Sequence, residues 1–138
     1  MSRYVLDTSV AIAWYLPETF AEAARVWQDR MLRDRVQLIV PNLHYWEFAN
    51  VLRTHVRGKT LDAPLAREIW ALHLDAPLEL VEPPLQAVLP VALDIGATAY
   101  DAVYVALATH LDVPLLTAER ASTPWVTHLG KRVQSILR

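Results

Sequence analysis

The chain has 138 residues, a hydrophobic fraction of 54%, a formal net charge of −2 at pH 7 and no cysteine. This is the size of one ordinary domain with a real core, and disulfides, thiol nucleophiles and cysteine-bound zinc are excluded. This net charge excludes a positive potential over the whole surface that would attract nucleic acid. No apolar run approaches the roughly 20 residues that span a bilayer. The N-terminus lacks the regions of a signal peptide, so we expect a cytoplasmic protein with no membrane partner.

Strands and helices are predicted to alternate along the sequence. Short apolar runs predict strands at 4–6, 36–40, 78–81, 113–116 and 133–137. Helix-compatible runs and spacing predict helices at about 10–15, 20–33, 42–57, 62–74, 90–96, 98–110 and 121–129. This alternation predicts an α/β fold with a parallel sheet and right-handed crossovers, and we expect residues 1–138 to form a single domain.

Several residues are interpreted as boundaries or faces of these helices. Asn42 is a candidate N-cap, and Pro90 is placed in the first turn of its helix. The helix after Asp62 is expected to bury an apolar stripe formed by Leu65, Ile69 and Leu72. Each of the three glycines falls at a predicted helix end, which leaves no glycine for a phosphate-cradling loop; they are Gly58, Gly96 and Gly130.

Asp7 directly follows the first predicted strand, in the sequence Asp7-Thr8-Ser9. Ligands of open parallel sheets gather at the carboxyl ends of the strands, so Asp7 is placed for a functional role. The alternative is that Asp7, Thr8 or Ser9 only caps the next helix.

Glu47 shares a predicted helix face with Leu43, Asn50 and Val51. Burying a carboxylate without a partner is costly, so this face must border solvent or another group must satisfy the charge. The alternative to a functional role is a boundary glutamate paired with an arginine. His44 is interpreted, like the other histidines, as a polar boundary residue and not as a metal ligand.

Asp101 and Glu119 are each expected near the first turn of a helix, where acidic residues are common for structural reasons alone. Thr98 and Asp101 have the spacing of a capping box, which is compatible with a carboxylate that also faces a metal. Glu119 follows a predicted strand, and Thr117 is a candidate cap for the next helix.

Two strand ends and two helices thus supply four acids: Asp7, Glu47, Asp101 and Glu119. If they converge, mutual repulsion raises their pKa values, and a divalent cation relieves that repulsion. Mg²⁺ binds hard oxygen ligands through one or two carboxylates while keeping several waters, and Mn²⁺ suits the same ligands. Such a site can activate water for in-line cleavage of a phosphodiester.

Other phosphate and hydrolase chemistries lack their motifs here. A P-loop or dinucleotide fingerprint needs spaced glycines, and a serine hydrolase needs Gly-x-Ser-x-Gly. A receiver domain would have paired acids after its first strand and a late-strand lysine, whereas the last lysine here is Lys131. A haloacid-dehalogenase-like phosphatase would have Asp-x-Asp, but Ser9 occupies the second position.

The pattern resembles the PIN-domain family, specifically the small VapC-type toxin ribonucleases of bacterial type II toxin–antitoxin systems. The resemblance runs the whole length, on Val5-Leu6-Asp7-Thr8-Ser9, Glu47-x-x-Asn50, the segment from Ala99 to Ala108, and Leu115-Leu116-Thr117-Ala118-Glu119-Arg120. It implies a three-layer α/β/α sandwich with a central parallel sheet, and a metal-dependent endoribonuclease using Mg²⁺ or Mn²⁺. It also implies an RNA substrate, a homodimer and a small cognate antitoxin.

The resemblance also assigns residues to roles. Asp7, Glu47 and Asp101 match the three family acids, and Ser9, Asn50 and Thr117 match accompanying polar positions. Glu119 departs from the family pattern, which has aspartate there, so the family's metal ligands correspond to Asp7, Asp101 and, with a longer side chain, Glu119. The alternatives are a housekeeping RNA-processing nuclease of the same family and a catalytically idle copy that acts as a binding module.

Overall fold

The computed structural model describes residues 1–120 and 122–137. Five parallel strands form one sheet in the order β3-β2-β1-β4-β5. They are β1 (Ser2–Leu6), β2 (Val36–Val40), β3 (Glu79–Leu80), β4 (Leu115–Thr117) and β5 (Val133–Ser135). The parallel sheet predicted from the alternating pattern is confirmed, and Asp7 directly follows the carboxyl end of the central strand.

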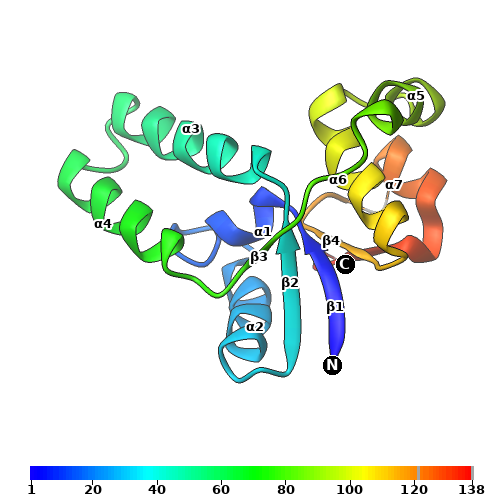
Figure 1. Ribbon diagram of the computed structural model, residues 1–138. Helices are drawn as coiled ribbons and strands as arrows, with labels where there is room; N and C mark the ends of the chain where they lie inside the picture. Colours follow the sequence, from blue (N-terminus) through cyan, green and yellow to red (C-terminus); the bar gives the residue numbers. More distant parts are fainter. Residues whose placement is uncertain (121, 138) are drawn as a thin grey trace.

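Helices cover both faces of this sheet (Figure 1), so the expected α/β/α sandwich is confirmed. The helices are α1 (Thr8–Ile12), α2 (Ala21–Leu32), α3 (Leu43–Arg57), α4 (Ala63–Leu74), α5 (Leu85–Ile95), α6 (Ala99–Leu111) and α7 (Pro124–Leu129). In Figure 1, α1 to α4 lie on one side of β1 and β2, and α5 to α7 lie on the other. Ala121, within the last predicted helix, lies outside the described residues.

The three strands β1, β2 and β4 send alternate side chains to two separate cores, as the period of a β-strand requires. Val5, Ile39 and Leu115 pack against the side that α5, α6 and α7 cover. Their chain neighbours Leu6, Leu38 and Leu116 pack against the side of α1 to α4. Burial on both faces explains why these strands read as continuous apolar runs in the sequence.

Two expectations about the starts of helices need correction. Pro90 lies inside α5 and not in its first turn, because the helix already begins at Leu85, after Pro84. The Pro90 ring is exposed, so solvent can satisfy the carbonyl that a missing N–H would leave unpaired. The Asn42 side chain makes no capping bond to α3; instead its backbone N–H donates to Glu82 Oε1 at 2.6 Å.

The predicted buried stripe of α4 is also wrong in two of its three members. Ile69 is buried, but Leu65 is 43% and Leu72 is 61% exposed. The buried residues are Ala66, Ile69 and His73. A hydropathy pattern ranks leucine above histidine for the core, whereas hydrogen bonds allow His73 to be fully buried here.

No single helix among residues 1–120 and 122–137 is long and apolar enough to cross a membrane. The bent pair α5 and α6, at 111° to each other, reaches the required length and composition only when the two helices are combined.

Candidate active site

A cleft of about 320 Å³ brings together the four acids that the sequence singled out. Asp7 comes from the end of β1, Glu47 from α3, Asp101 from the first turn of α6, and Glu119 from the loop after β4. The remaining lining residues are Thr8, Ser9, Ile12, Glu18, Phe20 and Val51. Segments that are more than a hundred residues apart in the chain therefore meet at the carboxyl ends of the two central strands.

Two hydroxyl groups hold Asp7 in place. Ser9 Oγ donates to Asp7 Oδ2 at 3.0 Å, and Thr117 Oγ1 donates to the same oxygen at 2.8 Å. Both hydroxyls also accept a backbone N–H, from Ala118 and Glu119 respectively, at 3.1 Å. Because both donors use Oδ2, Asp7 Oδ1 has no hydrogen bond from the described residues and is available to a ligand.

The environment of Asp7 favours its protonated form. Burial raises the pKa of Asp7 to about 6, the bonds from Thr117 and Ser9 oppose this, and the charges of Glu47 and Asp101 raise it further. Burial also raises the pKa of Asp101, against the opposing effect of its bond with Thr98. The repulsion between acids is the electrostatic condition that a bound cation would relieve.

Glu47 is satisfied by hydroxyl groups and lies at the edge of the buried face of α3. Tyr104 Oη donates to Glu47 Oε1 at 2.6 Å, and Thr8 Oγ1 donates to the same oxygen at 3.1 Å. The described residues show no arginine paired with it. The buried face of α3 is His44, Phe48 and Leu52, so the predicted face with Leu43, Glu47, Asn50 and Val51 is rotated by one residue.

Asp101 and Glu119 line the cleft from its two other sides. Thr98 Oγ1 accepts the backbone N–H of Asp101 at 3.1 Å, so the predicted cap of α6 is confirmed while the Asp101 carboxyl lines the cleft. Glu119 is exposed, and its backbone carbonyl accepts a bond from Ser135 Oγ at 2.7 Å. Asn50 is exposed and is not among the described residues that line the cleft.

Some residues around the cleft were missed by sequence reasoning. Tyr104 contacts Glu47 and lies three residues after Asp101, a spacing that could have indicated it. Glu18 and Phe20 line the cleft from the segment between α1 and α2, where no periodicity connects them to the acids. The boundary interpretation of His44 is wrong, because His44 and His73 are both fully buried and hydrogen-bonded to each other.

The oxygen donors of the cleft suit a divalent cation that keeps several of its waters better than one that is surrounded by protein ligands. Within residues 1–120 and 122–137, no three His, Cys, Asp or Glu side chains are arranged to hold one ion together. Mg²⁺ commonly binds through one or two carboxylates and keeps several waters. The free Asp7 Oδ1, with Asp101 and Glu119 on the same cleft, meets that smaller requirement.

The fold and the cleft together define one class of protein. In this class a parallel α/β/α sandwich gathers acidic side chains beyond the carboxyl ends of its central strands. The model of the PIN domain family matches residues 4–121, and the chain belongs to that family. It is 31% identical over 122 residues to Ribonuclease VapC3 of Pyrobaculum aerophilum, covering 86% of this chain and 90% of that protein.

Solved structures show the same fold. The crystal structure of PAE2754 from Pyrobaculum aerophilum aligns with a TM-score of 0.73 at 23% identity, over 98% of this chain and 90% of that one. Mycobacterium tuberculosis VapC20, described as a toxin that cleaves the sarcin–ricin loop, aligns with a TM-score of 0.64 at 13% identity, over 94% and 95% of the two chains.

Proposed function

We propose that this protein is a metal-dependent endoribonuclease and the toxin of a toxin–antitoxin pair. The observation that carries the proposal is the convergence of Asp7, Glu47, Asp101 and Glu119 on one cleft. The name of the curated relative, a VapC ribonuclease, supports RNA as the substrate. We further propose that residues 1–138 act as one domain and that the protein works in the cytoplasm, where single-stranded and looped RNA is available.

Asp7, Asp101 and Glu119 are the residues proposed to hold Mg²⁺ or Mn²⁺. When bound, such an ion supplies charge neutralisation, activated water and stabilisation of the leaving oxygen. Ser9 and Thr117 keep the Asp7 carboxyl oriented by binding Oδ2. Oδ1 is then left for the ion, and the side chain does not have to be ordered when the ion binds.

Glu47 is proposed as the group that accepts a proton from the attacking water. Its Oε1 already receives bonds from Tyr104 and Thr8, so Oε2 is the oxygen left for this role. The water oxygen forms a bond to phosphorus, the bond from phosphorus to the 3′ oxygen breaks, and the leaving oxygen takes up a proton. Arg120 is exposed and follows Glu119 in the sequence, and it is proposed to contact the phosphate backbone.

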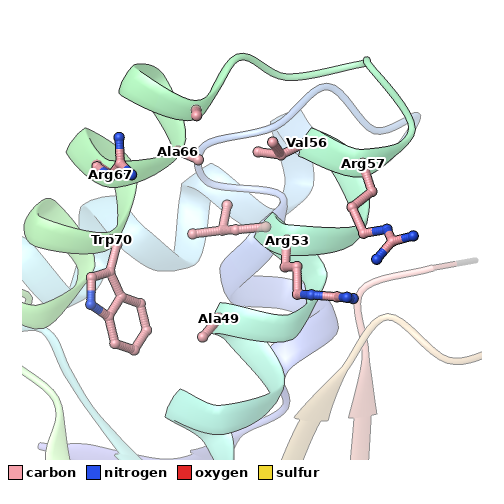
Figure 2. Close-up of a pocket in the computed structure, with 9 residues that line it drawn as sticks. Ala49, Arg53, Val56, Arg57, Ala66, Arg67 and Trp70 are labelled. Carbon is pink, nitrogen blue, oxygen red and sulfur yellow. The ribbon is translucent and has the colours of Figure 1, made fainter.

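A second hollow, between α3 and α4, is proposed as the docking surface for an antitoxin segment. It measures about 360 Å³ and is lined mainly by apolar atoms, with three arginines at its edge. Arg53 and Arg57 project from α3, whereas Arg67 and Trp70 project from α4 (Figure 2). An apolar hollow with an arginine edge fits an amphipathic segment that carries acidic residues.

The exposed leucines of α5 are proposed as the contact of a homodimer. Leu85, Leu89 and Leu93 are 85%, 64% and 73% exposed and repeat at i, i+4 and i+8 along one helix face. Asp94 is the single charged residue in α5, so a second copy can pack on the leucine face without like charges opposing each other.

The experiment that tests the proposed activity compares two site variants with a matched control. Asp7→Asn and Asp101→Asn should each abolish cleavage of single-stranded RNA in Mg²⁺ or Mn²⁺ while the protein stays folded by circular dichroism. The control is Asp112→Asn, the same change at the exposed end of α6, where a left-handed backbone (φ 54°) suits asparagine. Full activity in both site variants, or equal loss in the control, would overturn the proposal.

A further inference from the structure

A chain of hydrogen bonds runs through the core from α4 to the active-site cleft and ends on Glu47. Tyr15 Oη lies 3.0 Å from His73 Nδ1, and His73 Nε2 lies 2.8 Å from His44 Nε2. His44 Nδ1 lies 3.1 Å from Thr8 Oγ1, which is 3.1 Å from Glu47 Oε1. Both histidines are completely inaccessible to solvent.

The contact between the two rings requires at least one of them to be neutral. A direct contact between two Nε2 atoms needs one protonated and one unprotonated nitrogen, and a neutral imidazole carries one donor and one acceptor. His73 is stacked on Phe48 with centroids 4.0 Å apart and planes at 10°, so its two nitrogens are its only polar contacts. Burial lowers the pKa of His44 to about 3 and that of His73 to about 4, which keeps both rings neutral near pH 7.

The carboxylate of Glu47 decides the direction in which the protons point. The Thr8 hydroxyl has one proton and lies near His44, Glu47 and the Tyr104 hydroxyl, the last at 2.7 Å. If Thr8 donated to His44, its oxygen would face a carboxylate oxygen at 3.1 Å with no proton between them. Because Tyr104 gives its own proton to Glu47, Thr8 shares its single proton between Tyr104 Oη and Glu47 Oε1 in a three-centre bond. Thr8 therefore accepts the proton of His44 Nδ1.

The direction of the Thr8 hydroxyl determines the positions of the other protons in the chain. His44 carries its proton on Nδ1, so its Nε2 accepts from His73 Nε2–H. His73 Nδ1 is then unprotonated and accepts from the Tyr15 hydroxyl. Every donor along the chain points toward Glu47, where Tyr104 adds a further bond of 2.6 Å.

We propose that His44 and His73 are positioning residues that hold Glu47 through the oriented hydroxyl of Thr8. The role of Glu47 rests on the proposed function, but the hydrogen-bond chain does not. Both donors bind Oε1, so the chain holds that oxygen in place and leaves Oε2 without a hydrogen bond from the described residues, on a side chain that lines the cleft. Since His73 belongs to α4 and His44 to α3, the chain also connects the α3–α4 arm to the active site.

The first test reads the tautomers directly in the metal-free wild-type protein. Long-range ¹H–¹⁵N NMR at pH 7 should show His44 protonated on Nδ1 and His73 on Nε2, with both rings neutral. The opposite tautomers, or a charged ring, would overturn the proposal. This measurement needs no RNA cleavage, so absence of ribonuclease activity would overturn the proposed function while leaving the chain intact.

The second test uses two variants of His44 in which a side-chain amide takes the place of one ring nitrogen. His44→Asn can place an N–H near the Nδ1 position and preserve the donor to Thr8, whereas His44→Gln places its amide near Nε2 and loses that donor. The hydroxyl proton of Tyr104, bonded to Glu47, should be seen downfield in wild type and His44→Asn and should shift or vanish in His44→Gln.

Activity should follow the same order. His44→Gln should lower kcat roughly 10- to 100-fold with little change in KM, and His44→Asn should recover most of kcat. A purely structural role predicts instead that kcat follows the stability of each variant and that the Tyr104 signal is the same in both. Either of those results would overturn the proposal, and the wild-type tautomers decide it if neither variant folds.

Discussion

Replacing Asp7 by asparagine should stabilise the metal-free protein at neutral pH while removing its activity. The Asp7 carboxyl is held by Ser9 and Thr117 through one oxygen, and an asparagine Oδ1 can accept the same two bonds. The asparagine N–H₂ then replaces a charged oxygen in a cleft that it shares with Glu47 and Asp101. The substitution removes a desolvated charge and leaves the shape of the site nearly unchanged.

The pKa of Asp7 gives the size and the sign of the effect. Burial raises it from 3.8 to about 6, and each pKa unit corresponds to about 1.4 kcal/mol. Ionised Asp7 therefore destabilises the folded state by roughly 3 kcal/mol at most, and about 2 kcal/mol is the better expectation for a partly exposed side chain. This penalty is absent well below pH 3.8, where Asp7 is protonated in both states, grows between about pH 4 and pH 6, and is nearly complete at pH 7.

Urea unfolding in EDTA, measured between pH 4 and pH 8, tests this calculation. Asp7→Asn should exceed the free energy of unfolding of wild type by at most about 0.5 kcal/mol at pH 4 and by about 2 kcal/mol at pH 7 and above. In thermal unfolding the same gain is on the order of 5–10 °C for a chain of this size. The control Asp112→Asn should change neither value, because Asp112 is exposed and lies outside the cleft.

Two results would refute this reasoning. Equal stability of wild type and Asp7→Asn across the pH range would mean that Asp7 is well solvated and that the acids do not repel one another. A gain as large at pH 4 as at pH 7 would mean that the asparagine stabilises by new contacts and not by removing a charge.

Other variants test separate parts of the site and its surfaces. Thr117→Val removes a bond that lowers the pKa of Asp7, so the acidic limb of the pH–rate profile should move to higher pH. Glu119→Gln should weaken Mn²⁺ binding less than Asp7→Asn in calorimetric titration, because Glu119 is the more exposed side chain and is expected to hold the ion through a water. An equal loss would show that Glu119 is a direct ligand. Leu89→Lys should convert a dimer to a monomer in light scattering with the activity per chain retained, and an unchanged mass would exclude the α5 contact. Arg67→Glu should weaken antitoxin binding more than tenfold without changing RNA cleavage, and unchanged affinity would exclude the α3–α4 hollow.

The order of elements and the positions of the acids could be predicted because they depend on short-range patterns. The strand predicted over 36–40 agrees with β2 at both ends. A run of β-branched and apolar residues is typical of a strand, and Pro41 ends it. Asp7 could be placed because a carboxylate directly after a buried strand has a fixed location in a parallel sheet.

Partners that lie far away in the chain could not be predicted. The spacing of Tyr104 from Asp101 indicates that Tyr104 lies near the site. Its contact with Glu47, and that of Thr8, could not be predicted because these contacts join three elements that meet only in the folded protein. For the same reason, His44 and His73 read as boundary residues. Each is polar alone, and only their contact at 2.8 Å, with hydroxyls at both ends, allows them to be buried.

The chemical ends of the cleaved RNA test the central claim most directly. The cleft is lined by all four proposed acids and by no histidine among its described residues, which favours attack by water over attack by the ribose 2′-hydroxyl. Incubation of a defined RNA with Mg²⁺ or Mn²⁺ should yield 5′-phosphate and 3′-hydroxyl ends, and EDTA should abolish cleavage. Products with 2′,3′-cyclic phosphates, or cleavage that persists in EDTA, would contradict a metal-dependent hydrolysis at this site.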